Sequence, residues 1–480
     1  MLFRSPLDLT KPLSWKNANH DEQRMLRALQ GNILKGHGRS ATVNIFFKIA
    51  AAKKHEMRSA LREIANYHAT SAYQQLIETD NFHASGISGN PFVSVFLSAT
   101  GYAALGVAAG ATPADPSFKT GMKAAALGDA LVTSWDAAFQ GQIDGLVLVA
   151  SENDTALRRK RDAIATLLIA AGGAILKEQH GKAIFNQAND GIEHFGYVDG
   201  RSQPLLLVED NDTEARDAGI ASWDPQGSLD VALILDPGSS DGFSFGSYFI
   251  FRKLDQDVRG FKRNEQVLAD ALGFTGEARE LAGAMVVGRF EDGTPVTMSN
   301  EAKAANPPND FNYNADPGAR CPFQAHIRKV NPRGTGGFET PPKERKHLMA
   351  RRGIPYEDVA RLVHPSDLPG SATLAEFDAN VGPLLPTGDV GLLFMAYNRD
   401  LAAQFEFSQK SWANNPAFPA AGPPPKLDPI IGQGPVSAQH WPKGWDDPTA
   451  GNAAMSFQGF VKMRGGEYFF APSLNFLKSL

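Results

Sequence analysis

The chain has 480 residues, of which 42% are hydrophobic and 21% charged, and its formal net charge is −5. This balance is ordinary for a globular protein of two or more domains, and it offers no basic surface for nucleic acid or an anionic membrane. Cys321 is the only cysteine, which excludes an intramolecular disulfide and cysteine-rich zinc or iron–sulfur sites. The first residues carry no apolar run typical of a signal peptide, and the longest apolar stretches are too short for a membrane span. We therefore expect a cytoplasmic protein, with non-classical export or a removed leader left open.

Strands and helices alternate through the first half of the chain. Apolar residues recur at helical spacing near 20–35, 54–67, 101–108 and 155–172, which predicts helices there. The run Phe-Val-Ser-Val-Phe-Leu at 92–97 predicts a buried strand, and similar runs lie at 43–50 and 145–150. Residues 192–198 then lead into a loop that carries Asp199. The alternation favours a mixed α/β arrangement for this half.

A polar, turn-rich stretch at 208–228 separates the halves, so we expect one domain at 1–220 and a second at 221–480. In the second half, strands are expected at 231–235, 247–251, 390–396, 459–463 and 468–471, and helices at 264–272 and 399–412. The proline-rich segment 416–429 is expected to be irregular.

The most informative motif is the loop Gly196-Tyr197-Val198-Asp199-Gly200. Glycine allows tight turns and close approach of the backbone to a ligand. A carboxylate presented between two glycines suits the transfer of a proton. Asp-Gly is also ordinary turn chemistry, and this reading stays open.

Two further segments add the other parts of a haem site. A neutral imidazole such as that of His326 is a good iron ligand, and a haem with one axial protein ligand keeps its other face open for peroxide. Arg351 is always cationic and could stabilise the hydroperoxide anion. The alternatives are a histidine that only donates a hydrogen bond, a surface ion pair of Arg351, and Arg352 in the role of Arg351. Together with Asp199, the three segments suggest a haem with His326 on one side and Asp199 plus Arg351 on the other.

Three supporting residues complete the candidate site. An anionic partner makes a ligating imidazole more basic, and we expect Asp428 to be that partner of His326, although Asp before Pro also forms turns. Leu392 and Phe394 lie two positions apart on an expected strand and therefore share a face, which could pack over the open side of the haem. A plain core strand explains the same pattern.

At these residues the chain resembles the dye-decolourising peroxidase family, and its length and segments look most like the larger, fungal-type branch. The resemblance rests on the Gly196–Gly200 loop, on Cys-Pro-Phe-Gln-Ala-His-Ile-Arg-Lys-Val-Asn-Pro-Arg around His326, and on Arg-Arg-Gly-Ile-Pro-Tyr at Arg351. Further similar segments lie at 29–39, 246–254 and 466–470, so the likeness runs from about residue 29 to the C-terminus.

The resemblance implies an α+β fold of two ferredoxin-like domains, each with an antiparallel sheet and surrounding helices. It implies one haem b per chain, held mainly by the C-terminal domain, with His326 as proximal ligand and Asp199 and Arg351 on the distal side. Leu392 and Phe394 would shape the route of hydrogen peroxide. The implied activity is peroxide-dependent oxidation of dyes, phenolics and related aromatic donors through a ferryl intermediate. The alternative is a haem-binding or haem-iron-handling protein of the same fold with little turnover.

Bulky donors do not fit a pocket sized for peroxide, and similar enzymes are thought to pass electrons inward from surface Tyr or Trp. Tyr397, Trp412 and Trp441 are the C-terminal candidates for this relay, with core packing as the default. The oligomeric state is left open.

Overall fold

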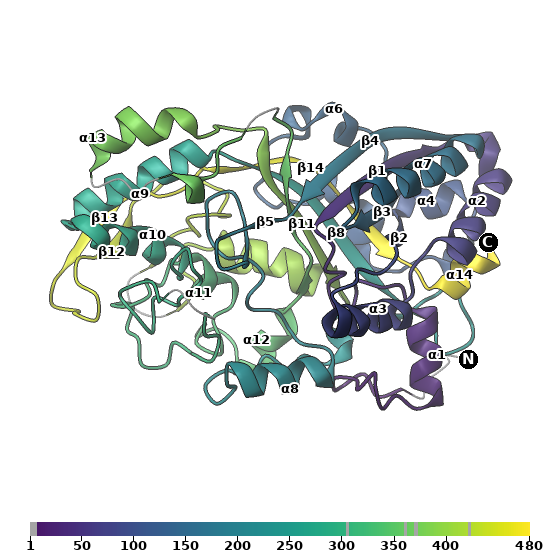
Figure 1. Ribbon diagram of the computed structural model, residues 1–480, viewed down its shortest axis with the longest axis horizontal. Helices are drawn as coiled ribbons and strands as arrows, with labels where there is room; N and C mark the ends of the chain where they lie inside the picture. The colour runs from purple at the N-terminus through teal and green to yellow at the C-terminus, as the bar shows by residue number, and fades with distance from the viewer. Residues whose placement is uncertain (1–6, 304–306, 360–361, 369–372, 421–423) are drawn as a thin grey trace.

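The computed structural model describes residues 7–303, 307–359, 362–368, 373–420 and 424–480 (Figure 1). Its helices are α1 (His20–Ala28), α2 (Lys54–Tyr67), α3 (Ala72–Ser85), α4 (Ala99–Ala104), α5 (Pro116–Thr120), α6 (Ala137–Gln140), α7 (Asp154–Ala170), α8 (Val208–Asp217), α9 (Val258–Leu272), α10 (Glu280–Val287), α11 (His326–Val330), α12 (Pro341–Glu344), α13 (Leu374–Glu376) and α14 (Leu474–Ser479). Its strands are β1 (Ala41–Ile49), β2 (Phe92–Leu97), β3 (Gly145–Ser151), β4 (Gly173–Lys182), β5 (Ile184–Phe185), β6 (Gly191–Ile192), β7 (Ile234–Leu235), β8 (Phe245–Gln256), β9 (Ala350–Arg351), β10 (Ile354–Glu357), β11 (Val390–Asn398), β12 (Gln439–Pro442), β13 (Asn452–Met455) and β14 (Val461–Ala471).

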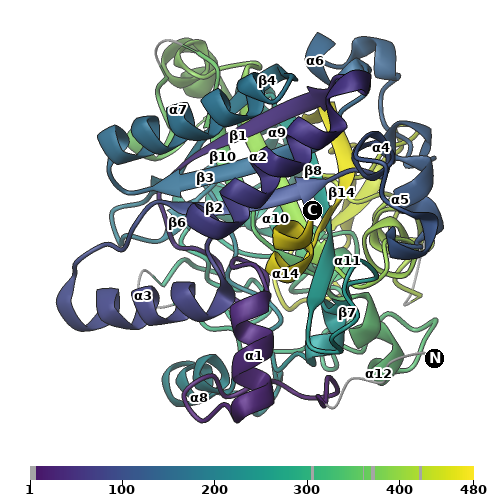
Figure 2. The same cartoon turned by 90° about the vertical axis from the view of Figure 1, so that its right-hand side faces the viewer.

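The first half of the chain forms an antiparallel sheet in the order β4-β1-β3-β2. Helix α2 follows β1 and α7 follows β3, which is the βαββαβ arrangement of a ferredoxin-like unit. Strand β2 is buried along its whole length, as expected for a strand that is apolar on both faces. Helix α7 packs across β1, β3 and β4, and α2 lies beside it (Figure 2).

The second half repeats this order with β14-β8-β11-β10. Strand β8 is the long central strand. Two short strands join this sheet: β7 pairs with β8, and β9 pairs with β11. The strands expected at 459–463 and 468–471 form one strand, β14, with a shift of register between Met463 and Gly465. The predicted α+β fold with two ferredoxin-like sheets is therefore confirmed.

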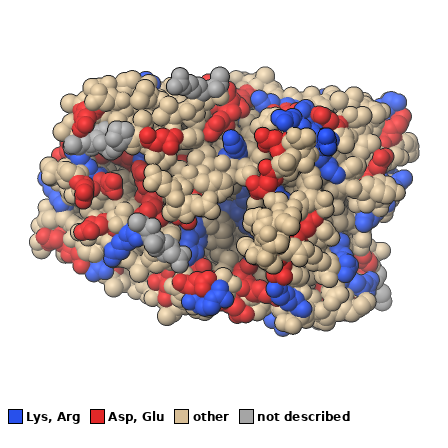
Figure 3. All heavy atoms as spheres, viewed as in Figure 1, with Lys and Arg blue, Asp and Glu red and all other residues tan. Residues whose placement is uncertain are grey.

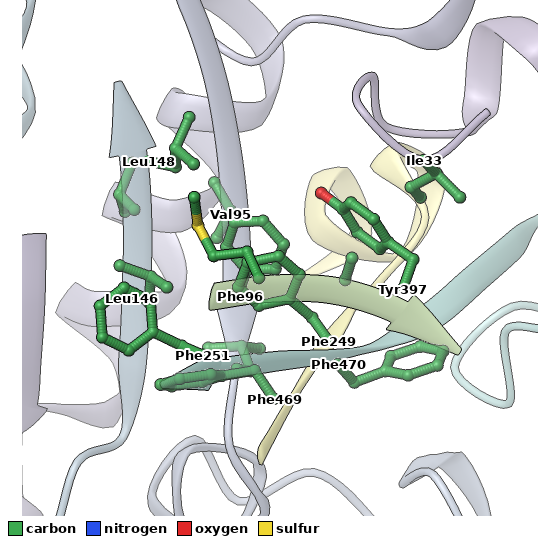
Figure 4. Close-up of a cluster of buried hydrophobic side chains, with 14 of the residues drawn as sticks. Ile33, Val95, Phe96, Leu146, Leu148, Phe249, Phe251, Tyr397, Phe469 and Phe470 are labelled. Atoms are coloured by element: carbon green, nitrogen blue, oxygen red, sulfur yellow. The ribbon is translucent and has the colours of Figure 1, made fainter. Parts of the chain in front are cut away.

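The two sheets meet at both of their edges: Phe470 of β14 pairs with Leu97 of β2, and β10 lies beside β4. Aromatic side chains from both units fill the space between them: the rings of Phe96 and Phe249 stack with centroids 4.1 Å apart, and Tyr397 lies 5.0 Å from Phe249 (Figure 4). Burial of such large apolar groups is the main stabilisation of a core like this one. The units lie side by side along the long axis of the molecule (Figure 1).

Several expected elements differ from the structure. The first helix ends at Ala28 instead of near residue 35, because Leu29 adopts an extended conformation. Part of the turn-rich stretch 208–228 is helix α8, and the helix expected at 399–412 is wound as π-helix at Ala402–Glu406 and Ser408–Ala413. Strands of the first sheet all precede residue 183 and those of the second all follow residue 233, but a boundary at residue 220 stays a prediction. Residues 421–423 of the proline-rich segment lie outside the described residues.

Within the described ranges, no helix combines the length and the apolar character that a membrane crossing requires. Acidic and basic side chains are interspersed on the face shown in Figure 3, which is hollowed near its centre.

Candidate active site

One cavity of about 590 Å³ brings together segments from both halves of the chain. Its lining includes Asp199, His326, Arg351, Leu392 and Phe394, so the structure places these predicted site residues around a single space. The size lies within the range of cofactor pockets, and much of the remaining lining is aliphatic, from residues such as Val287, Ile327, Leu348, Ile430, Ile431 and Val461.

His326 opens the short helix α11, and its ring is fixed by a buried carboxylate. Nδ1 of His326 lies 2.9 Å from Oδ2 of Asp428, which is fully buried. The backbone N–H groups of Ile430 and Ile431 donate to Oδ1 of Asp428 at 2.8 and 2.9 Å. Burial alone would raise the pKa of Asp428, but the His326 partner and these two N–H donors outweigh it and hold the pKa below its ordinary value. An ionised Asp428 keeps a proton on Nδ1 and leaves Nε2 as the nitrogen able to bind a metal.

Asp199 follows a tight turn on another segment of the lining. Its N–H donates to the carbonyl oxygen of Gly191 at 3.0 Å, and the N–H of Gly200 donates to its Oδ1 at 2.6 Å. Gly200 has φ +76 and Gly196 has φ +98, conformations that favour glycine and explain why the carboxylate stands between two of them. The Asp199 side chain is exposed to the cavity, which suits proton transfer more than a purely structural turn.

Arg351 lies on β9, next to β11, and its guanidinium is only lightly bonded by the protein. Its Nη2 donates to the carbonyl oxygen of Ser202 at 2.9 Å, and its N–H donates to Oε1 of Gln203 at 3.0 Å. Arg352 also reaches the lining, but its guanidinium donates to the carbonyl oxygens of three residues, Asn32, Ile33 and Arg351. The geometry therefore favours Arg351 over Arg352 as the cation available to a ligand.

Leu392 and Phe394 alternate along β11 with the fully buried Leu393 and Met395. They share the face that lines the cavity, as their spacing predicts. On the paired strand, Leu254 lies opposite Leu392 and also lines the cavity.

Buried cations beside the cavity fit a ligand with acid groups. Arg289, which lines the cavity, donates to the carbonyl oxygens of Gly293 and Pro308 at 2.7 and 3.0 Å, and Arg333 donates to that of Asn309 at 2.7 Å. Neither forms an ion pair with a carboxylate in the described part of the chain. Burial, reinforced by the charge of Arg333, lowers the pKa of Arg289 to about 9, and burial lowers that of Arg333 to about 10. A largely apolar cavity lined by histidine and arginine side chains fits a haem, whose iron takes an imidazole ligand and whose carboxylate arms need cationic partners.

A metal bound directly by the protein fits less well, because the described residues contain no group of three or more His, Cys, Asp or Glu side chains placed to hold an ion. A single imidazole is what a haem iron requires from the protein.

The three aromatic residues named as candidate relays, with core packing as their default explanation, are all buried. Tyr397 and Trp441 have no exposed surface, and Trp412 is 3% exposed. Core packing, the default explanation, accounts for their positions, since Tyr397 packs on Phe249 and Trp412 stacks on Phe418.

Sequence reasoning assigned no role to Glu193, Gln256 or Arg289, all of which line the cavity. Arg289 interrupts an otherwise apolar run, and this local signal could have drawn attention to it. Gln256 carries no such signal, because its position at the end of β8 becomes meaningful only after folding.

Comparisons with known proteins agree with this site. Residues 28–183 match the family model described as the DyP dimeric alpha+beta barrel domain. The chain is 46% identical to the multifunctional dye peroxidase DyP2 of Amycolatopsis sp. over 99% of its own length and 100% of that protein, whose solved structure superposes with a TM-score of 0.92. It is 30% identical to Peroxidase 2 of Mycetinis scorodonius over 95% of this chain and 87% of that one. A dye-decolorizing peroxidase solved in complex with 2,6-dimethoxyphenol is 28% identical, with a TM-score of 0.73 over 95% of this chain and 98% of that one.

Two ferredoxin-like sheets, a shared cavity and full-length similarity to named peroxidases lead to the same conclusion: the chain belongs to the dye-decolourising (DyP-type) peroxidase family.

Proposed function

We propose that the protein is a haem peroxidase that uses hydrogen peroxide to oxidise dyes, phenolics and related aromatic donors. The observation that carries the proposal is the convergence of His326, Asp199 and Arg351 on one cavity from three separate segments of the chain. Support for the donor class comes from relatives named as dye peroxidases and from the relative solved with 2,6-dimethoxyphenol.

The cofactor that we propose is one haem b per chain, which supplies a redox-active iron that peroxide oxidises and organic donors reduce one electron at a time. His326 would hold the iron through Nε2, with Asp428 keeping the proton on Nδ1. Arg289, a buried cation in the lining, is the residue that we propose for the acid groups of the haem. Leu392 and Phe394 would cover the open face and narrow the space to the size of peroxide.

Asp199 and Arg351 would act on peroxide itself. The carboxylate of Asp199 accepts the proton from one peroxide oxygen and returns it to the other, which then leaves as water. The guanidinium of Arg351 stabilises the hydroperoxide anion and the negative charge that develops on the departing oxygen. Because the Arg351 guanidinium has one main-chain partner, its remaining N–H groups are available for this task.

We also propose a place in the larger, fungal-type branch, supported by matches to most of the length of fungal relatives. The relative from Amycolatopsis is more similar, at 46% identity. Two domains divided near residue 220 remain part of the proposal, and so does a cytoplasmic location.

The deciding experiment is an absorption spectrum of the purified protein followed by rapid mixing with peroxide. A Soret band and fast spectral change are expected in the wild type. Asp199→Asn and Arg351→Leu should keep the Soret band and react more slowly by about a hundredfold or more. If the wild type and both variants keep their haem and all three react equally slowly with peroxide, the result would instead support the haem-binding or iron-handling alternative.

A further inference from the structure

The turn before Asp199 is built around a carboxylate that the proposed peroxide chemistry does not use. Glu193 and Tyr197 close the turn, because the N–H of Glu193 donates to the carbonyl oxygen of Tyr197 at 3.1 Å. The N–H of Gly196 donates back to the carbonyl oxygen of Glu193 at 2.9 Å. Ile192 and Val198 pair on either side of the turn, and Asp199 follows at once.

The side chain of Glu193 folds into this turn and accepts its inward N–H groups. Oε2 accepts from the N–H of Phe195 at 2.9 Å, and Oε1 accepts from the N–H of Tyr197 at 3.1 Å. A third donor comes from outside the loop: Nε2 of Gln256, at the end of β8, lies 2.6 Å from Oε2. The carboxylate therefore supplies acceptors to two main-chain N–H groups and ties the turn to the central strand of the second sheet.

The position of Asp199 depends on this turn. The N–H of Val198 donates to the carbonyl oxygen of Glu291 and that of Asp199 to the carbonyl oxygen of Gly191, so the segment that follows the turn is held at main-chain level. The Asp199 side chain itself has only the N–H of Gly200 as a partner in the described residues. The carboxylate is therefore placed by the main chain around it, and the turn is the part of this main chain whose hydrogen bonds depend on Glu193.

Gln256 has a second orientation available. It is 4% exposed, and its Oε1 is a buried acceptor with no hydrogen-bond partner in the described part of the structure. Rotation of the amide by half a turn presents Oε1 to Glu193 instead of Nε2. That orientation suits a protonated Glu193, whose O–H then donates to Oε1, whereas the present orientation suits the carboxylate.

We propose that Glu193 and Gln256 act as a positioning pair for the distal loop, in which a proton on Glu193 and rotation of the Gln256 amide together loosen the turn that places Asp199. The inference rests on the proposed function, since it concerns the residue expected to move the peroxide proton. The pair acts through Asp199 and does not itself touch peroxide.

The surroundings of Glu193 set the pH range in which it takes up a proton. Burial raises the pKa of Glu193 to about 7, and the charge of Asp199 adds to the rise. Tyr197 faces it on the same loop, and beyond Tyr197 the buried Lys262 pairs with Glu265 and Glu291. No lysine or arginine forms an ion pair with Glu193 among the described residues, so both protonation states are populated near neutral pH.

The test measures the turn directly. The measurement is hydrogen exchange in the full-length protein, with and without haem. The protection factors of the amide protons of Phe195 and Tyr197 should be about tenfold higher above pH 7 than below it, which is the effect of one net hydrogen bond. Glu193→Gln should give low protection at every pH and no step. Asp190→Asn, which removes a carboxylate on the same loop outside the turn, should keep the step of the wild type.

A second variant covers the case in which Glu193→Gln does not fold. Gln256→Met removes one donor to the carboxylate, so the step should move to higher pH while the protein keeps its fold. In the haem-loaded wild type, the rate of reaction with peroxide should show an inflection at the pH of the step. Equal protection on both sides of pH 7 in the wild type, or a step that stays in place in Gln256→Met, would overturn the inference. Absence of any reaction with peroxide would overturn the proposed function and leave the exchange result standing.

Discussion

Nδ1 of His326 and Oδ2 of Asp428 lie 2.9 Å apart although the two residues are 102 positions apart in the chain. The first prediction concerns this pair. Asp428→Asn removes the negative charge behind the imidazole, which makes it a weaker donor to ferric iron. The reduction potential of the bound haem should therefore rise and the rate of reaction with peroxide fall by about 10–100-fold.

Spectroelectrochemical titration of the haem-loaded variants checks this expectation. Asp446→Asn is the matched control, because Asp446 is an exposed carboxylate that pairs with Arg320. A potential that is the same in Asp428→Asn and the wild type would show that the pair does not tune the imidazole.

Substitution of the adjacent residues Arg351 and Arg352 should affect different properties of the protein. Arg351→Leu is expected to unfold at nearly the wild-type urea concentration while losing about a hundredfold or more in the rate of reaction with peroxide. Arg352→Leu leaves the carbonyl oxygens of Asn32 and Ile33 without their donor, so it should lose about 1–3 kcal/mol in the free energy of unfolding. Urea titration and rapid mixing on both variants separate the two effects. The opposite pattern would exchange the roles of Arg351 and Arg352.

Arg289 should matter for retention of the cofactor. Arg289→Met removes a buried cation that lines the cavity, so haem should be lost to an acceptor protein roughly 10–100-fold faster, as expected for a charge-assisted bond. The control is Arg263→Met, because Arg263 forms its ion pair with Asp378 at the exposed surface. Equal rates of haem loss in the two variants would remove Arg289 from the cofactor site.

His194 should make the protein less stable in acid. Burial lowers the pKa of this histidine from 6.5 to about 4, and its Nε2 bonds the carbonyl oxygen of Tyr356 at 2.9 Å. The unfolded chain takes up a proton at His194 below pH 6.5 and the folded protein does not, so stability present above pH 6.5 is lost as the pH falls towards 4.

His194→Gln keeps an N–H donor but does not titrate. The difference in unfolding free energy between wild type and variant should therefore change by on the order of 2–3 kcal/mol between pH 7 and pH 4. Glu193, whose pKa is raised, contributes in the opposite direction in both proteins and cancels in the comparison. A difference that does not vary with pH would show that His194 has the same pKa in the folded and unfolded states.

The sequence predicts best those elements whose pattern is strong on its own. Strands β2 and β3 are apolar except for one serine each because both of their faces are buried, and α2 shows its buried face through Met57, Leu61 and Ile64. Strand β4 escapes prediction because it is rich in polar residues that find partners only after folding: Glu178 pairs with Arg161, and Gln179 donates to Asp358. The ends of helices also give only a weak signal in the sequence. Helix α1 illustrates this, because it ends at Ala28 instead of near residue 35.

The candidate site divides in the same way. Asp199, His326 and Arg351 lie within short motifs that resemble a family, so their convergence could be expected before the structure. Glu193, Gln256 and Arg289 depend on segments that meet only in the folded chain, and no spacing in the sequence links them. The buried positions of Tyr397, Trp412 and Trp441 could not be deduced either, because an aromatic residue has the same local pattern in a core and at a surface.

Strand β14 has a consequence for how the protein must be made. It lies between β8 and β2, and the helix that follows it packs on α2, where the guanidinium of Arg62 bonds the carbonyl oxygen of Leu480. The edge of β2 and one side of α2 therefore stay uncovered until residues 461–480 have left the ribosome. A nascent chain stalled short of β14 should expose these apolar surfaces and depend on chaperones, although the first half and most of the second have already been translated.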